Sequence, residues 1–230
     1  MTERTKAKLA QWADKYNDPV YFTEDPVAFP REFARRGARR QDIEIAAVFA
    51  AHFAWGRRAM IVRDTSRLMD EMQWRPYDYV MAGDWRDDDT SVHRTVKWSE
   101  VAQICRNLRD WYSTRDTLEK MSVRLMRTCI YGQKEDTRAP NKKINMLRRW
   151  MTRRDGIVDL GIWRDSDPAE LVIPLDVHVY EEALALNLTD RRSKDIATAA
   201  QITDAFREIW PEDPCKGDFA LFGYGVSKNA

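Results

Sequence analysis

Apolar residues recur every three to four positions along most of the chain, a spacing that predicts amphipathic helices. The stretch 41–54 shows this most clearly. Its apolar positions are Ile43, Ala46, Ala47, Ala50 and Phe53. The same spacing predicts further helices over 5–16, 58–72, 99–112, 117–131, 141–153, 177–186, 194–210 and 214–223. Period-two alternation is scarce, so we expect an all-α protein of around ten helices.

Turn-forming residues separate the predicted helices. Gly56 and Gly132 each follow a helical stretch, and Pro76 ends the helix over 58–72 because the residue before a proline is disfavoured in helical conformation. Ser99 is a candidate N-cap for the helix that follows it.

One acidic run, 84–89, interrupts the helical pattern and lies in the segment 83–97, which we interpret as an exposed connection. We expect a single helical domain over 1–230, in a compact two-lobed body. The lobes are predicted to comprise 1–83 together with 160–230, and 98–155.

Composition narrows the class of protein. The 230 residues are 43% hydrophobic and 33% charged, which is enough apolar material for a core and excludes wholesale disorder. Glycine and proline number nine each, as suits a helical chain. No apolar run approaches the roughly 20 residues that span a bilayer, and the charged N-terminus does not resemble a signal peptide. We therefore expect a soluble, cytoplasmic protein that does not contact a membrane.

Metal and nucleotide motifs are not found in the sequence. The three cysteines, Cys105, Cys129 and Cys215, are widely spaced and form no CxxC pair, which argues against a disulfide framework, a zinc ribbon or an iron–sulfur cluster. The three histidines form no metal-binding pair, and phosphate-binding loops of the P-loop or GxGxxG type are missing. We expect no metal and no cofactor.

Positive charge is local rather than general. Lys+Arg total 38 and Asp+Glu 37, a net charge of +1, yet 138–154 holds seven cations and no acid. A second basic stretch, 31–40, holds five arginines and one glutamate. Such runs are typical of a solvated helix face, and they are also what binding to a phosphate backbone requires.

Two kinds of residue in the chain, lysine and aspartate, are candidates for catalytic roles. Lys142 and Lys143 open the helix predicted over 141–153, and a neutral lysine amine is a nucleophile toward carbon. Asp176 follows Pro174 and precedes a helix, where it is well placed as an N-cap. Capping fixes a carboxylate's rotamer and favours its charged form, which also suits a group that stabilises a developing cation. Taken alone, each residue is better explained by an ordinary structural role: most lysines at such positions are merely solvated, and capping explains Asp176.

Five blocks of sequence carry a resemblance to a known family. They are the segment 25–57, KKINMLRRWM at 142–151, DLGIW at 159–163, PLDVHV at 174–179 and DPCKGDFALFGYG at 213–225. Together they resemble a bacterial family that is distantly similar to the helix-hairpin-helix (HhH-GPD) DNA glycosylases, nearest to the archaeal 8-oxoguanine DNA glycosylases. The resemblance covers roughly 16–226.

The resemblance implies a fold, an activity and a site. It implies the all-α glycosylase fold, with Lys142 as the nucleophile and Asp176 as the catalytic carboxylate; Lys143 is the alternative nucleophile. The implied reaction is excision of a damaged base, such as 8-oxoguanine, flipped out of double-stranded DNA, followed by abasic-site lyase cleavage through a Schiff base. We expect a monomer to carry it out.

Further residues are candidates for contacts with DNA. Trp55 and Phe222 are expected to stack on a flipped base and Asp218 to accept from its edge, although core packing or helix capping would explain the same residues. The candidates for the DNA backbone are Arg138, Lys143, Arg148, Arg149 and Arg153. We expect Arg148, Arg149 and Arg153 to project outward from an amphipathic helix whose packed face holds Ile144, Leu147 and Met151.

Two other functions fit the sequence. The chain is alternatively a non-catalytic binder of DNA or structured nucleic acid on the same scaffold, or a protein-interaction domain whose basic stretches are solvated. A repair enzyme requires both Lys142 and Asp176 in one site, whereas a binder does not.

Overall fold

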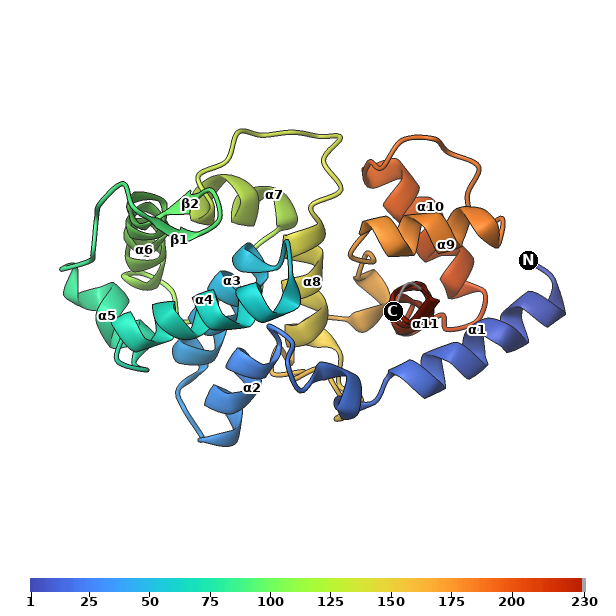
Figure 1. The fold of residues 1–230 in the computed structure, drawn as a ribbon, viewed down its shortest axis with the longest axis horizontal. Helices are drawn as coiled ribbons and strands as arrows, with labels where there is room; N and C mark the ends of the chain where they lie inside the picture. The colour runs from blue at the N-terminus through green and yellow to red at the C-terminus, as the bar shows by residue number, and fades with distance from the viewer. Residues whose placement is uncertain (229–230) are drawn as a thin grey trace. The chain divides into compact units, whose positions relative to one another are not determined.

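The computed structural model describes residues 1–228 and is helical throughout most of that range (Figure 1). It contains eleven α-helices and one two-stranded hairpin within those residues, so the prediction of an all-α protein is confirmed. The last two residues of the predicted domain, 229–230, lie outside the described residues. No helix in the described range is long and apolar enough to cross a membrane.

The chain divides into two compact units. Unit 1 contains 1–21 and 136–230, and unit 2 contains 22–135. These units differ from the lobes expected from the sequence, because 22–83 groups with 84–135 and the helix after Pro140 groups with the C-terminal part of the chain. The reason for the second difference lies in ion pairs that join that helix to later segments, described below.

Unit 1 is built from helices at both ends of the chain. Its elements are α1 (Glu3–Tyr16), α8 (Lys142–Thr152), the 3-10 turn η3 (Pro168–Glu170), α9 (Val177–Ala185), α10 (Ile196–Arg207) and α11 (Lys216–Lys228), and a further 3-10 turn, η1 (Pro19–Phe22), leads into unit 2. Its core joins α1, α9, α10 and α11 through fully buried side chains that include Leu9, Val179, Ile202, Phe206 and Leu221.

Helix α1 packs along α11, drawn in blue and dark red in Figure 1. Trp12 stacks on Tyr224 with ring centroids 3.7 Å apart, and the Tyr16 hydroxyl lies 2.8 Å from the Ser227 hydroxyl. Gly223 permits this approach, since a Cβ there would lie 2.3 Å from the Tyr16 ring. The N-terminal helix α1 therefore packs against α11, the helix that carries the candidate residues Asp218 and Phe222.

Unit 2 is organised around α3. Its elements are α2 (Ala28–Arg35), α3 (Arg40–Phe53), α4 (Arg58–Glu71), α5 (Pro76–Ala82), β1 (Ser91–His93), β2 (Val96–Lys97), α6 (Trp98–Tyr112), α7 (Val123–Leu125) and the π-helical turn η2 (Met126–Ile130). Every residue of α3 from Asp42 to Phe53 is buried, and α2, α4 and α5 pack against it. A helix buried all round is the expected centre of such a unit.

The helix predicted over 117–131 is wrong in its first half. Only α7 and η2, from Val123 to Ile130, are helical there. The buried Glu44 of α3 explains the difference, because its carboxylate accepts hydrogen bonds from the Thr117 hydroxyl (2.5 Å) and the Leu118 backbone N–H (3.0 Å). Satisfying a buried carboxylate outweighs the weak helical preference of a short segment.

Three local predictions also need correction. The segment 83–97 is not wholly an exposed connection, since β1 and β2 pair within it and Val92, His93 and Val96 are buried. Pro76 does not end the preceding helix, since α4 ends at Glu71; it opens α5 at its first position, where a missing N–H costs nothing. Helix α6 begins at Trp98 after Lys97, with no side-chain cap, so Ser99 is not its N-cap.

Candidate active site in unit 1

Helix α8 places Lys142 in its first turn. Asn141 precedes it in the left-handed region (φ 48°, ψ 40°), so the chain turns sharply before the helix begins. The Asn145 side-chain amide donates to the Pro140 carbonyl at 3.0 Å and secures this entry. The packed face of the helix contains Ile144, Leu147 and Met151, as predicted. Lys142 itself keeps a third of its side chain exposed.

Asp176 caps α9, as the sequence predicts. Its Oδ1 accepts hydrogen bonds from the backbone N–H groups of His178 (2.7 Å) and Val179 (3.2 Å). These two bonds satisfy donors at the positive end of the helix and fix the carboxylate's orientation. The second oxygen, Oδ2, remains for another partner.

That partner is Lys142. Its Nζ lies 3.4 Å from Asp176 Oδ2, and the two side chains are 33% and 13% exposed. The structure thus brings together an amine and a carboxylate that are 34 positions apart, and a catalytic role for the pair stays a prediction. One carboxylate oxygen is committed to the backbone and the other to the amine, an arrangement that can accept a proton from the amine or stabilise positive charge beside it.

Asp218 lies in the first turn of α11 and is 3% exposed. Its Oδ2 accepts a hydrogen bond from Arg149 Nη1, whereas its Oδ1 has no hydrogen-bond partner within the described part of the chain. Burial raises the pKa of Asp218 to about 6; the Arg149 guanidinium opposes the rise, and the negative charge of Asp176 adds to it. The negative charge of Asp176 thus acts on Asp218, whose pKa of about 6 lies above the ordinary range for an aspartate.

Phe222 and His178 lie next to these groups. Phe222 follows Asp218 by one turn of α11, and its half-buried ring meets the His178 ring edge-on at 6.2 Å between centroids. His178 Nδ1 is buried and has no hydrogen-bond partner among residues 1–228.

Trp55, the remaining base-stacking candidate, belongs to unit 2. Its ring is half-buried, and the Arg94 guanidinium lies over it at 4.3 Å from the ring centroid. The edge of the ring meets His93 in a T-shaped arrangement at 5.8 Å. A stacking role for Trp55 on a base stays a prediction.

Two arginines expected on the DNA backbone are instead buried. Arg149 and Arg153 are 5% and 1% exposed, so the expectation that they project outward is wrong. Arg149 pairs with Asp218 and with Asp159, whose Oδ1 lies 3.4 Å from Arg149 Nε. Both guanidiniums also lie over the Phe219 ring, 4.5 and 4.8 Å from its centroid.

Arg153 holds three carboxylates at the end of α8. Its Nη1 donates to Asp159 Oδ2 at 2.6 Å, its Nε donates to Asp213 Oδ1 at 2.8 Å, and its Nη2 lies 2.9 Å from Asp155 Oδ2. The two arginines and their four acidic partners form the buried ion-pair cluster: Arg149, Arg153, Asp155, Asp159, Asp213 and Asp218. This cluster explains why α8 belongs to the same unit as the C-terminal helices.

Backbone geometry brings Asp159 into this cluster. The segment after α8 folds back on the helix end, where Leu160 N–H donates to the Trp150 carbonyl at 2.7 Å and Trp163 N–H donates to the Met151 carbonyl at 2.8 Å. Gly161 makes the fold-back feasible, since its φ is +60° and a Cβ there would lie 2.5 Å from the Arg153 carbonyl oxygen. The sequence block containing Asp159 was noted, but its role as an ion-pair partner was missed.

The remaining cations differ in exposure. Arg138 is 82% exposed, with an ion pair to Asp195 at 4.0 Å. Arg148 is half-buried, and burial lowers its pKa. Lys143 is also half-buried. These three remain candidates for phosphate contacts. In the described range, no group of three or more His, Cys, Asp or Glu side chains is arranged to hold a metal ion.

Comparison with known proteins places the chain in a family. A family model described as "Protein of unknown function (DUF2400)" matches residues 25–137 and 129–227, which is most of the chain. The protein therefore belongs to the DUF2400 family. No curated protein and no solved structure matches it.

Proposed function

We propose that this protein is a DNA base-excision glycosylase with associated abasic-site lyase activity, and that it has a helix-hairpin-helix glycosylase-like fold. The observation that carries the proposal is the approach of Lys142 Nζ to Asp176 Oδ2 at 3.4 Å, with the amine still partly exposed. The all-α fold and the blocks of sequence that resemble this superfamily support it. The proposed substrate is an oxidised purine, such as 8-oxoguanine, in double-stranded DNA.

The first step replaces the bond from the sugar to the base. Asp176 accepts a proton from Lys142, and the neutral amine attacks C1′ of the flipped nucleotide. The C1′–N9 bond breaks, and the base leaves with that electron pair and takes up a proton. Because positive charge grows on the sugar during this step, a carboxylate held rigidly beside C1′ lowers the barrier.

The second step uses the covalent bond just formed. The sugar ring opens as O4′ takes up a proton and Lys142 becomes linked to C1′ as a Schiff base. Loss of a proton from C2′ then expels the 3′ phosphate by β-elimination, and water releases the lysine. Both side chains belong to the same chain, so one monomer is sufficient for the reaction.

The residues around the pair are proposed to hold the base. Asp218 has an unpartnered buried oxygen, and its pKa of about 6 lets the carboxyl act as an acceptor when ionised and as a donor when protonated. Phe222 offers an aromatic ring on the same face of α11. A flipped purine needs edge hydrogen bonds and a stacking surface of this kind.

Borohydride trapping tests the chemistry. The protein is incubated with a duplex that contains 8-oxoguanine or an abasic site, and borohydride reduces the Schiff base to a stable amine. We expect a covalent protein–DNA adduct in the wild type, none in Lys142→Gln and an adduct in Lys143→Gln, which is the matched control for charge and position.

Three outcomes would contradict the proposal. Adduct formation that is unchanged in Lys142→Gln would exclude this lysine as the nucleophile. Salt-dependent duplex binding without any adduct would support the alternative of a non-catalytic DNA binder, and failure to bind even at low ionic strength would exclude both nucleic-acid functions. Circular dichroism on each variant separates loss of chemistry from loss of folding.

A further inference from the structure

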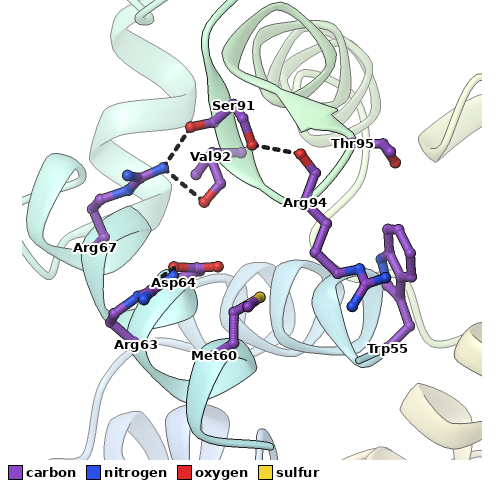
Figure 2. Close-up of a pocket in the computed structure, with 9 residues that line it drawn as sticks. All are labelled: Trp55, Met60, Arg63, Asp64, Arg67, Ser91, Val92, Arg94 and Thr95. Carbon is purple, nitrogen blue, oxygen red and sulfur yellow. Dashed lines mark hydrogen bonds and ion pairs between the residues drawn. The ribbon is translucent and has the colours of Figure 1, made fainter. Parts of the chain in front are cut away.

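Unit 2 contains a cavity of about 530 Å³ that the proposed chemistry does not use. Figure 2 shows the residues that line it: Trp55, Met60, Arg63, Asp64, Arg67, Ser91, Val92, Arg94 and Thr95. They come from the end of α3, from α4 and from the hairpin of β1 and β2. Three of the nine are arginines and one is an aspartate, so the lining is strongly cationic in a protein with a net charge of only +1.

Arg94 is held in a defined position over the cavity. It lies in the left-handed region (φ 54°) in the turn between β1 and β2, and its guanidinium stacks on Trp55. Gly56 leaves the space for it, since a Cβ there would lie 2.6 Å from Arg94 Nη1. The Arg94 guanidinium forms no ion pair with any residue from 1 to 228. A cation fixed by stacking and left without a carboxylate can receive an anion.

The aspartate in the lining is already neutralised. Asp64 is 3% exposed, its Oδ1 accepts from Arg63 Nε at 2.8 Å, and its Oδ2 lies 2.8 Å from His93 Nδ1. Both oxygens are therefore engaged at the base of the cavity. The Arg63 side chain is 71% exposed, and a guanidinium carries five N–H donors, so donors remain beyond those used on Asp64.

Arg67 makes the cavity wall rigid. Its Nη2 donates to the carbonyl oxygens of Ser91 and Val92, both at 2.7 Å, and so attaches strand β1 to helix α4 (Figure 2). The Ser91 hydroxyl donates to the Arg94 carbonyl at 2.6 Å and closes the turn. The hairpin that carries Arg94 is thus braced before any ligand arrives, which lowers the entropic cost of binding.

We infer that this cavity is a second binding site, which takes a phosphate group on Arg94. Guanidinium forks match phosphate oxygens in charge and geometry, and the apolar surfaces of Met60 and Val92 give room for the organic part of the ligand. The phosphate belongs either to a nucleic-acid backbone or to a small phosphate ester. The site does not depend on the Lys142 chemistry.

The experiment measures the binding of three ligands to the full chain. Calorimetry records the binding of inorganic phosphate and of a nucleoside monophosphate, and fluorescence anisotropy records the binding of an undamaged duplex across a salt series. The variant is Arg94→Gln. The matched control is Arg115→Gln in the same unit, because Arg115 is also exposed and stacks on a tryptophan, Trp111, at 4.1 Å.

Two results support the site and identify the source of the phosphate. If the source is a backbone, Arg94→Gln lowers the slope of log affinity against log salt by about 0.9, and Arg115→Gln leaves the slope unchanged. If the source is a small ester, the wild type and Arg115→Gln bind a small phosphate saturably, and Arg94→Gln weakens that binding about tenfold, as loss of one charge-assisted hydrogen bond does.

One result overturns the site. If Arg94→Gln and Arg115→Gln behave alike with the duplex and with both small phosphates, the cavity does not bind phosphate. Borohydride trapping distinguishes this failure from failure of the proposed function, because Arg94→Gln is expected to keep the Lys142 adduct at saturating duplex concentrations.

Discussion

The two ends of α8 carry similar charges and have opposite fates. At its start, Lys142 keeps a third of its side chain exposed and pairs with one carboxylate, Asp176. At its end, Arg149 and Arg153 are almost wholly buried and are surrounded by four carboxylates of the buried ion-pair cluster. The first end has an amine that remains in contact with solvent, whereas the cations at the second end join α8 to later segments of the chain.

This difference shows that a basic run in a sequence is not by itself a binding surface. Within 138–154 the cations outnumber the acids by seven to none, yet part of that excess is cancelled by acids from elsewhere in the chain. Arg149 and Arg153 form ion pairs with Asp159, Asp213 and Asp218, whose positions differ from theirs by between 6 and 69 residues. Only the cations that keep solvent contact, such as Arg138, are available to a phosphate.

The largest loss of stability is expected when an arginine is removed from the buried ion-pair cluster at the end of α8. Arg153→Met should destabilise the protein by about 3–5 kcal/mol, because Asp159 and Asp213 are left without their main partner. Lys142→Met should cost less than about 1 kcal/mol, because its ion pair is partly exposed. Urea unfolding measures both. If Arg153→Met and Lys142→Met lowered the free energy of unfolding equally, the proposed difference between the two ends of α8 would be wrong.

A smaller effect on the free energy of unfolding is expected from the titration of Asp218. This residue pairs with Arg149 near the end of α8, and its pKa is raised further by Asp176, the partner of Lys142 at the start of α8. Its raised pKa of about 6 means that the folded state holds this proton more tightly than the unfolded chain does. The associated stability is fully present below about pH 4, the ordinary range for an aspartate, and is lost as pH rises through about 6. At about 1.4 kcal/mol per pKa unit, the whole change is at most about 3 kcal/mol.

The measurement is the free energy of unfolding at several pH values between 4 and 7.5. Asp218→Asn should remove this component of the pH dependence. Asp204→Asn is the control, because Asp204 is exposed on α10 and should leave the pH dependence unchanged. A wild-type profile that Asp218→Asn does not alter in this window would show that Asp218 is not the titrating group.

A further small effect on stability is expected at Asp176, where the structural role and the proposed chemical role can be separated. Asp176→Ala removes the cap of α9 and should cost about 1 kcal/mol, whereas Asp176→Asn keeps a capping oxygen and should cost less. Both variants should lose the borohydride adduct, because neither has a carboxylate beside Lys142. Unfolding and trapping are measured on the same preparations.

The control for this prediction is another capping aspartate in unit 1. Asp195 caps α10 by accepting from the Thr198 N–H at 3.0 Å, so Asp195→Ala should lose comparable stability and keep the adduct. Trapping that survives in Asp176→Asn would leave Asp176 with a structural role only.

Periodicity was sufficient to find most of the helices. The predicted spans 58–72, 141–153 and 177–186 agree within a residue or two with α4, α8 and α9. One failure occurred where a tertiary contact competed with a weak local preference. The 117–131 span lost its first half to hydrogen bonds with Glu44, a residue more than 70 positions earlier in the chain.

The candidate site was also only partly predictable, because some of its interactions are local in the sequence and others join distant residues. Asp176 was identifiable as a cap because its partners are the next two N–H groups along the chain, a local interaction. Asp159 and Asp213 could not be assigned to arginines, because nothing in the spacing of residues shows which charges are removed from water together. The cavity beside Arg94 was missed because its walls come from three separate segments.

The sequence by itself determined that this protein is helical, where most helices begin and end, and which aspartate caps α9, since those features depend on neighbours within a few residues. Only the tertiary structure decided which basic residues stay in contact with water. The free energy of a charge depends on the solvent and the counter-charges around it, and the folded chain brings those from distant positions.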